Sequence, residues 1–314
     1  MEKKLTREER RRFREAQKLT QIGPVSNVIF NVLLLLFALL CVLPMVLVIS
    51  VSFSSETSIN QYGYRFIPTV PSLEGYVFLF KQRQVMLRAL WMSILVTGLG
   101  TVLGILFCMT MGYGLSRGTF KMRKIYNWLV FIPMVFSGGM VAQYYVNTQL
   151  LHLKNNLWIL ILPMAVSSFN IIICRTFLTT TIPDSVIESA KIDGAGQFTI
   201  FFKIVLPLSL PVMATIGLFM SFGYWNDWFT AMLYIQNPDL YTLQAFLQKI
   251  IQNIENLVKN GQLLGYNARE VLASLPQEAA RMGIVILIVL PIACVYPFFQ
   301  RYFVTGLTVG AVKG

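Results

Sequence analysis

Few residues in this sequence could carry catalytic or metal chemistry. The chain holds one histidine, His152, in a short connecting segment, which argues against a histidine-based metal site or catalytic dyad. Its four cysteines lie within or at the end of apolar segments, without the paired spacing of a disulfide or zinc framework: Cys41, Cys108, Cys174 and Cys294. A Gly-x-x-x-x-Gly-Lys-Ser/Thr phosphate-binding loop is absent, so we expect no ATP hydrolysis by this chain. The sequence therefore predicts no catalytic residues and no metal site.

Asp227 stands out because it is the only charged residue clearly inside an apolar run. Ionisable side chains at membrane depth are costly and usually face a bundle interior or water. Asn226 and Asp227 could line the path of a solute, beside aromatic rings that suit the apolar faces of sugars: Tyr224, Trp225 and Trp228. An aromatic belt with a snorkelling carboxylate near the membrane surface explains the same residues equally well.

The composition indicates which kind of element positions these residues. Hydrophobic residues make up 55% of the 314, charged residues only 13%, and the mean hydropathy is +0.62. These values lie outside the range of soluble domains. The formal net charge is +12, but the basic residues fall mostly in short loops between apolar runs, which fits membrane topology better than nucleic-acid binding. We therefore predict an all-α membrane protein.

Six apolar runs are long enough to cross a hydrocarbon core of about 30 Å, which takes roughly 20 residues each. They lie near 27–50, 90–115, 126–146, 157–175, 205–234 and 282–303. Most basic residues fall on one side of these runs, so the positive-inside rule predicts that both termini lie in the cytoplasm of a multi-pass cell-membrane protein. The expected parts are a basic N-terminal arm, a six-span domain and a C-terminal tail, at 1–24, 25–304 and 305–314.

The stretch 183–211 lies between two of these runs and carries the most distinctive pattern of the chain. Pro183 suits the first turn of a helix and Gly194 is placed to end it, so we expect a short helix over 184–193. One face of this helix is apolar and the other residues supply charges: Val186, Ile187 and Ala190, then Glu188, Lys191 and Asp193. The pattern predicts a docking element.

This stretch resembles the Glu-Ala-Ala loop of permease subunits in binding-protein-dependent ATP-binding-cassette (ABC) importers. The matching residues are Glu188, Ala190, Asp193, Gly194, Ala195, Phe201, Ile204, Leu206, Pro207 and Pro211, while Ser189 stands where the family usually has alanine. The resemblance implies a type I importer permease fold and a cytoplasmic coupling helix at about 184–194. It assigns ATPase coupling to six residues: Glu188, Ser189, Ala190, Asp193, Gly194 and Ala195. Among them, Glu188 would be a polar anchor and Gly194 the turn.

The C-terminal residues 299–314 carry a second resemblance, to the tail of the second permease of maltose-type carbohydrate importers. In that family the tail enters the ATPase dimer interface, which implies ATPase contact for Gly310 and Lys313. Residues 225–227, Trp-Asn-Asp, also resemble the fifth-span pattern of carbohydrate permeases. The basic arm and the segment 51–89 most resemble the branch that handles complex or acidic oligosaccharides such as aldouronates.

Two segments on the outer side are long, 51–89 and 235–281. We expect short amphipathic helices in the first and an amphipathic helix from Leu243 to Leu257 in the second. In the family such segments help to dock the binding protein, but each could equally be a structural cover over the bundle. On the second span, Gly100 and Gly104 form a Gly-x-x-x-Gly pattern, which favours packing within one bundle over a subunit interface.

We therefore expect a permease subunit that takes up oligosaccharides by alternating access. Its expected partners are a homologous six-span permease, two ABC ATPase subunits, an extracellular solute-binding protein and membrane lipid. The chain itself is expected to bind no cofactor, since the partner ATPases would bind ATP and magnesium. A permease for a peptide or a polyamine is the alternative within the class. A secondary transporter would need ion-coupling groups at mid-membrane, and a membrane enzyme would need a catalytic set.

Overall fold

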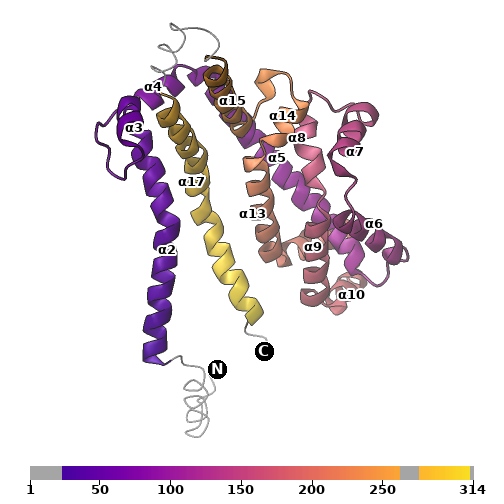
Figure 1. Cartoon of the computed structure of the whole chain (residues 1–314). Helices are drawn as coiled ribbons and strands as arrows, with labels where there is room; N and C mark the ends of the chain where they lie inside the picture. Colours follow the sequence, from indigo (N-terminus) through magenta and orange to yellow (C-terminus); the bar gives the residue numbers. More distant parts are fainter. Residues whose placement is uncertain (1–22, 262–275, 312–314) are drawn as a thin grey trace.

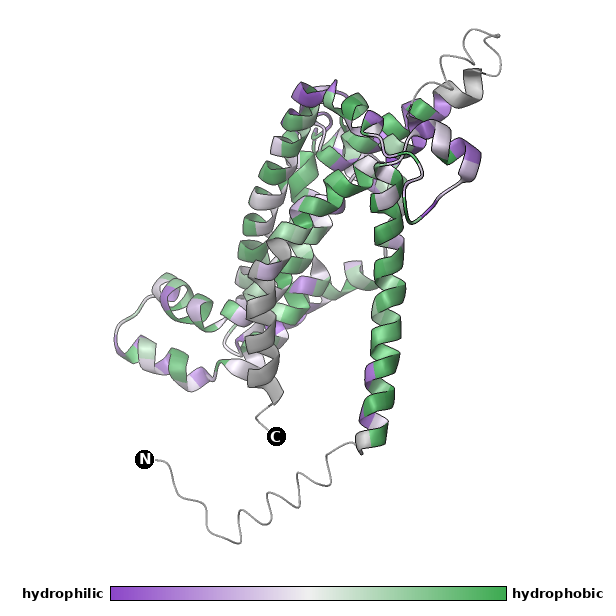
Figure 2. Ribbon diagram, turned by 90° about the vertical axis from the view of Figure 1, so that its left-hand side faces the viewer, coloured by the Kyte–Doolittle hydropathy of each residue, from purple (hydrophilic) through white to green (hydrophobic). Residues whose placement is uncertain are grey.

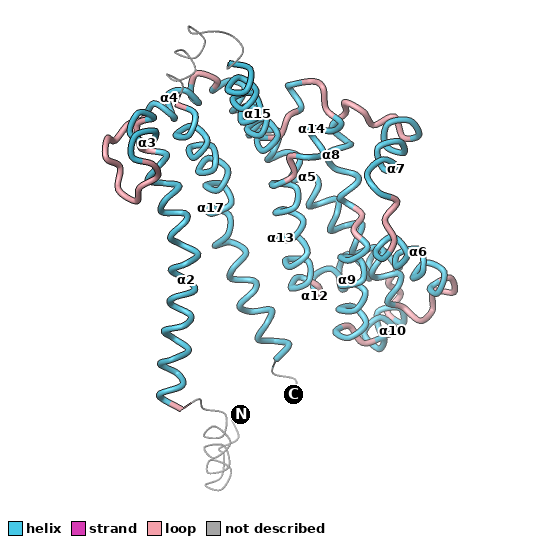
Figure 3. Tube along the Cα trace, viewed as in Figure 1, coloured by secondary structure: helices cyan, strands magenta, loops and turns pink. Residues whose placement is uncertain are grey.

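The computed structural model describes residues 23–261 and 276–311, and every regular element in these ranges is helical (Figures 1 and 3). The longer elements are α2 (Pro24–Ser52), α5 (Arg83–Ser116), α6 (Arg123–Val135), α9 (Ser168–Thr181), α13 (Leu210–Asn226), α15 (Leu243–Gly261) and α17 (Gln277–Ala311). The shorter α-helices are α3 (Glu56–Tyr62), α4 (Glu74–Phe80), α7 (Gly139–Tyr145), α8 (Leu157–Ala165), α10 (Asp184–Ile192), α11 (Gln197–Ile200), α12 (Leu206–Leu208) and α14 (Phe229–Tyr234). Two π-helical turns, η1 (Val146–Leu150) and η2 (Phe201–Val205), and a 3-10 turn, η3 (Pro238–Leu240), complete the described elements.

Three of the described helices are long and apolar enough to cross a membrane by themselves: Val25–Ser52, Arg83–Ser116 and Gln277–Cys294. Two bent pairs pass the same test together: Leu157–Ala165 with Ser168–Thr181, bent by 45°, and Gln197–Leu208 with Leu210–Asn226, bent by 79°. The described residues thus supply three to five candidate spans, and the predicted count of six is not confirmed.

The difference arises in the predicted run 126–146, which does not form one helix. Helix α6 has 13 residues and ends at Val135, and α7 begins only at Gly139. The φ of Gly139 is +78°, a conformation that glycine adopts at little energetic cost. Thirteen residues of α-helix extend about 20 Å, which is short of the roughly 30 Å hydrocarbon core. Pro133 near the end of α6 and the Gly138–Gly139 pair are the physical reason for the break.

Helix α5 is the centre of the packed bundle, with α8, α9 and α13 against it. Its glycines allow this close approach. A Cβ on Gly100 would meet the Tyr224 ring at 2.5 Å, and one on Gly104 would meet the Met220 Cε at 2.1 Å. On Gly112 it would meet the Cys174 Cβ at 2.7 Å. The interpretation of the Gly-x-x-x-Gly pattern as packing within the bundle is therefore confirmed.

Helix α2 contrasts with α5, because it exposes apolar side chains along nearly all of its length. Figure 2 shows it as an almost unbroken hydrophobic column, whereas hydrophilic residues gather mainly at the two ends of the molecule. Its principal neighbour is α17, which lies beside it at the end away from the N-terminus (Figure 1). An apolar helix with this much exposed surface requires lipid or another apolar helix around it.

The expected helices of the outer segments are present as α3, α4 and α15. Helix α15 begins at Leu243, as predicted, and extends four residues beyond the predicted end to Gly261. At this end of the molecule Glu56 on α3 accepts hydrogen bonds from the backbone N–H groups of Glu278 (3.2 Å) and Ala279 (3.3 Å), which are the free donors at the start of α17. Burial raises the pKa of the Glu56 carboxyl above its ordinary value.

Candidate functional site

Helix α10 spans Asp184–Ile192, within one residue of the helix predicted over 184–193. Pro183 precedes it in an extended conformation, so this residue is the N-cap instead of lying in the first turn. Ile187 and Ala190 are buried, but Val186, expected on the same apolar face, is exposed. Helix α10 lies at the same end of the molecule as the described ends of α2 and α17 that adjoin the termini (Figure 1).

Gly194 ends the helical turn with a φ of +83°, a left-handed conformation in which a residue with a Cβ is strained. Its N–H bonds to the Lys191 carbonyl at 3.0 Å, and the Ala195 N–H bonds back to the Ala190 carbonyl at 2.9 Å. These bonds satisfy carbonyls at the end of α10 and reverse the chain direction. A Cβ on Gly194 would meet nothing within 4 Å, so only the backbone conformation requires a glycine here.

Arg117, directly after α5, connects this helix to α9 and α10. Its guanidinium donates hydrogen bonds to the carbonyls of Leu178 (3.1 Å) and Ile182 (3.2 Å) and to Asp184 Oδ1 (2.7 Å). The side chain is only 10% exposed, and the guanidinium carbon lies 5.4 Å from the centre of the Tyr113 ring. A cation here satisfies carbonyls at the negative end of the α9 dipole. The ends of α5 and α9 and the start of α10 are thus joined through one side chain.

From the sequence, Arg117 is expected to contribute only to membrane topology. The available signal is its position, as the first polar residue after a 34-residue apolar helix and before a glycine. That signal indicates an interfacial cation but does not identify its acceptors, which lie 61 to 67 residues away in sequence.

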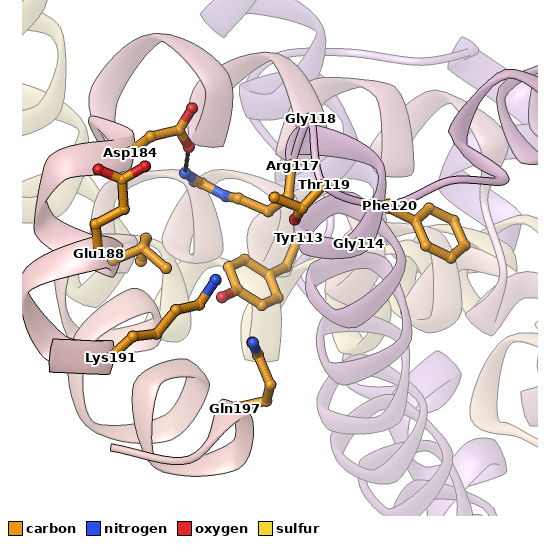
Figure 4. Close-up of a pocket in the computed structure, with 11 residues that line it drawn as sticks. Tyr113, Gly114, Arg117, Gly118, Thr119, Phe120, Asp184, Glu188, Lys191 and Gln197 are labelled. Atoms are coloured by element: carbon orange, nitrogen blue, oxygen red, sulfur yellow. Dashed lines mark hydrogen bonds and ion pairs between the residues drawn. The ribbon is translucent and has the colours of Figure 1, made fainter. Parts of the chain in front are cut away.

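A cavity of about 390 Å³ lies between the end of α5, the segment that follows it, and α10 (Figure 4). Four charged side chains line its wall: Arg117, Asp184, Glu188 and Lys191. Among the described residues, the Glu188 carboxylate has no ion-pair partner, whereas Asp184 is bonded to Arg117. Within the same part of the chain, no three histidine, cysteine, aspartate or glutamate side chains are grouped as a metal site. The cavity is therefore suited to polar contact with a partner surface.

The predicted path residues occupy two different environments. Tyr224 and Trp225 are buried, and they donate hydrogen bonds to the carbonyls of Ile161 (2.7 Å) and Ile288 (3.3 Å) respectively. Asn226 and Trp228 are exposed where α13 ends. Asp227 is half-buried at the break between α13 and α14, and its Oδ1 accepts a hydrogen bond from the Thr230 N–H at 3.0 Å. In this conformation the rings of Tyr224 and Trp225 pack within the bundle, and the Asp227 carboxylate accepts a hydrogen bond from a backbone N–H at the start of α14.

The expected C-terminal tail lies partly outside the described residues. Helix α17 continues to Ala311, so Gly310 belongs to this helix, while Lys313 is not among the described residues. The basic arm, at 1–22, is also outside them. The other predicted coupling residues, Ser189, Asp193 and Ala195, lie on α10 or in the turn after it.

The sequence of this chain is similar to the sequences of known transport proteins. No family model matches the chain. The polygalacturonan/rhamnogalacturonan transport system permease protein YtcP of Bacillus subtilis (strain 168) is 38% identical over 294 residues, covering 92% of this chain and all of that protein. The arabinooligosaccharides transport system permease protein AraQ of the same organism is 27% identical over 296 residues, covering 92% and 97%.

A solved structure shares the fold. The crystal structure of a bacterial ABC transporter involved in the import of the acidic polysaccharide alginate contains a chain that matches with a TM-score of 0.76 and 27% sequence identity. The match covers 89% of this chain and 96% of that one. With the helical bundle, the apolar spans and the α10 turn, these likenesses show that the chain belongs to the permease subunits of oligosaccharide ABC transport systems.

Proposed function

We propose that this chain imports oligosaccharides as one of two permease subunits, driven by two separate ABC ATPases and supplied by an extracellular binding protein. The observation that carries the proposal is α10, a short helix that ends in a glycine-specific turn and is bonded through Arg117 to the end of α5. In this role both termini and α10 lie in the cytoplasm. The partner ATPases bind the ATP and magnesium.

The proposed coupling follows from the contacts of α10. Closure of the ATPases on ATP would displace α10, with Glu188 as its polar anchor and Ala190 packed closely, and Gly194 would let the chain return towards the membrane. Arg117 bonds both to Asp184 on α10 and to the carbonyl end of α9. Displacement of α10 would therefore shift α5 and α9, and with them the helices that pack on α5. This exchange between two packed arrangements is alternating access.

For the substrate, we propose oligosaccharides that contain uronic acids. The relative YtcP is named for polygalacturonan and rhamnogalacturonan transport, and the similar structure for import of an acidic polysaccharide. For the solute path we propose the residues at the break after α13: Asn226, Asp227 and Trp228. Tyr224 and Trp225 are buried, so a change of conformation would be needed to expose them to the solute. Contact of Gly310 and Lys313 with the ATPases is a further proposal.

The test begins with mild-detergent purification of the chain from its native membrane and identification of the co-purifying proteins. We expect a second permease and an ABC ATPase, whose recovery is lost when Glu188 and Gly194 are both changed. The complex is then reconstituted in vesicles with the binding protein, and uptake of oligogalacturonate is compared with uptake of neutral arabinooligosaccharides. Solute uptake without ATP, or a chain that is purified alone, would contradict the importer function. Preference for the neutral sugar would contradict only the substrate class.

A further inference from the structure

A second cavity, of about 290 Å³, lies between α5, α6 and α9, apart from the cavity at α10. Most of its wall is apolar and comes from these three helices: Leu115, Trp128, Val130, Phe131 and Ile172. Two polar side chains, Asn127 and Arg175, complete the wall. A mainly hydrophobic groove that contains one guanidinium and one amide favours a ligand with an apolar body and an anionic head.

The Arg175 guanidinium has no hydrogen bond or ion pair with any described residue, although the side chain is partly buried. An unpaired cation against apolar helices is unfavourable unless water or an anion contacts it. The backbone of Arg175 packs closely on α5, because its N atom lies 3.0 Å from where a Cβ on Gly112 would be. Arg175 thus lines the groove without a counter-ion from the described chain.

The sequence explains why no counter-ion is close. From residue 75 to residue 183 the chain contains no aspartate or glutamate, and this range includes all of α5, α6 and α9. The next acidic residue, Asp184, already bonds to Arg117. Basic residues, in contrast, gather just before and at the start of α6: Lys121, Arg123 and Lys124. The groove therefore lies in a region of positive charge, and an anion must come from outside these helices.

The position of Arg175 indicates the source of that anion. It precedes the last residue of α9, Thr181, by six positions, which is about 9 Å along an α-helix. In the orientation that the proposed function gives the chain, this is the level of the cytoplasmic headgroups. Basic residues and tryptophan are enriched at that level, and the exposed Trp128 fits this rule. Anionic lipids of the cytoplasmic leaflet attract such basic clusters.

We propose that this groove binds one anionic phospholipid of the inner leaflet. Arg175 and the Asn127 amide bind its phosphate, and an acyl chain lies against the apolar wall formed by Val130, Phe131 and Ile172. A free phosphate would satisfy the guanidinium but leave this apolar wall uncovered, which is why we assign the site to a lipid. The proposal rests on the proposed function only for the membrane orientation of α9.

The test measures lipid retention instead of transport. The purified chain, in whatever complex it forms, is placed in phosphatidylcholine nanodiscs with a small labelled fraction of phosphatidylglycerol, and the label bound per permease is measured. We expect Arg175→Gln to lower the affinity for phosphatidylglycerol about fivefold, which corresponds to about 1 kcal/mol for one basic residue near an anionic surface. Arg175→Lys should restore part of the loss, because a point charge remains but the fork of donors does not.

The control variant is Lys124→Gln, which removes the same charge from an exposed position that does not line the groove. It should lower the affinity by less than Arg175→Gln does. Equal retention by wild type and Arg175→Gln would overturn the proposal, and a helix of the partner permease would then be the occupant to test. Displacement of the label by inorganic phosphate would overturn the lipid assignment in favour of a free-anion site. Because no ATP or transport enters the measurement, failure of the importer function would not alter this result.

Discussion

Two arginines, Arg117 just after α5 and Arg175 within α9, show opposite solutions to placing a cation beside an apolar bundle. Arg117 is buried and has three protein acceptors, whereas Arg175 is partly buried and has none among the described residues. Their helices, α5 and α9, pack directly against each other. The two arginine sites therefore share their supporting backbone, but only the Arg117 site contains the acceptors for its guanidinium.

The position along the helix explains this difference. Arg117 lies beyond the end of α5 and next to the end of α9, where the Ile182 carbonyl lies past the helix and the Leu178 carbonyl accepts one backbone bond, of 3.3 Å, from the Ile182 N–H. Arg175 lies inside α9, where backbone carbonyls are already used by the helix itself. The first arginine is bonded to the chain through both of its terminal nitrogens and becomes a structural connection. The second is left for an external anion.

The largest effect is expected from Arg117→Met, which keeps much of the side-chain volume but removes the donors. It removes the charged bonds to the carbonyls of Leu178 and Ile182, of which the Leu178 carbonyl keeps only its bond from the Ile182 N–H. Hydrogen bonds to a charged group are worth about 1.5–3 kcal/mol each. We expect transport per ATP hydrolysed to fall about tenfold or more in reconstituted vesicles. Arg123→Met, which removes a charge at the start of α6, is the control and should leave the ratio close to wild type. Equal ratios for both variants would contradict a connecting role for Arg117.

Gly112→Ala tests the backbone that the two arginine sites share. The new Cβ would lie 2.7 Å from the Cys174 Cβ and 3.0 Å from the Arg175 N, so α5 and α9 must separate. Overpacking of this kind costs about 1–3 kcal/mol. We expect a lower thermal midpoint of the purified complex, a lower transport ratio and weaker phosphatidylglycerol retention together.

Gly98→Ala is the matched control for this variant, because Gly98 lies on the same helix and a Cβ there would meet nothing within 4 Å. It should behave as wild type in all three measurements. A Gly112→Ala protein that loses transport but keeps full lipid retention would show that the two sites do not depend on a common backbone.

Local features of the sequence were enough to predict α10, its end at Gly194 and the outer helices. Capping residues, glycine and amphipathic spacing act within a few residues, so they can be read from the chain directly. The contacts of Arg117 could not be predicted in this way, because its acceptors depend on how α5 packs on α9. The same limit applies to Tyr224, whose hydroxyl reaches the Ile161 carbonyl across the bundle.

The prediction of six spans shows that a local pattern can also be insufficient. Hydropathy identified the run 126–146 correctly as apolar, but length and composition do not fix whether such a run is one helix or two. Pro133, Gly138 and Gly139 were visible in the sequence, yet breaks of this kind are also tolerated within single spans. The roles of the coupling residues, including Glu188 and Ala190, stay predictions for the experiments above.

Gly194→Ala addresses the turn that follows α10, where a smaller effect is expected than at Arg117. A left-handed conformation costs a residue with a Cβ about 1–2 kcal/mol, and no steric clash adds to this cost. We expect a fall in transport per ATP of about fivefold, with normal assembly of the complex. Gly196→Ala has equally open space but a φ of −69°, so it should be neutral. If both variants were equally impaired, loss of glycine flexibility would explain the result better than the φ of Gly194.

The smallest effect is expected from Asp184→Asn, which separates the two kinds of bond that Arg117 makes. The Asp184 side chain is 71% exposed, and ion pairs in solvent contribute about 0–1 kcal/mol. The asparagine oxygen can still accept a hydrogen bond, and the carbonyls of Leu178 and Ile182 remain bonded to Arg117. We therefore expect transport per ATP to fall less than twofold, with the remaining difference reduced at high salt because exposed charges are screened. A loss as large as that of Arg117→Met would mean that the ion pair, and not the capping of α9, holds α10 to the bundle.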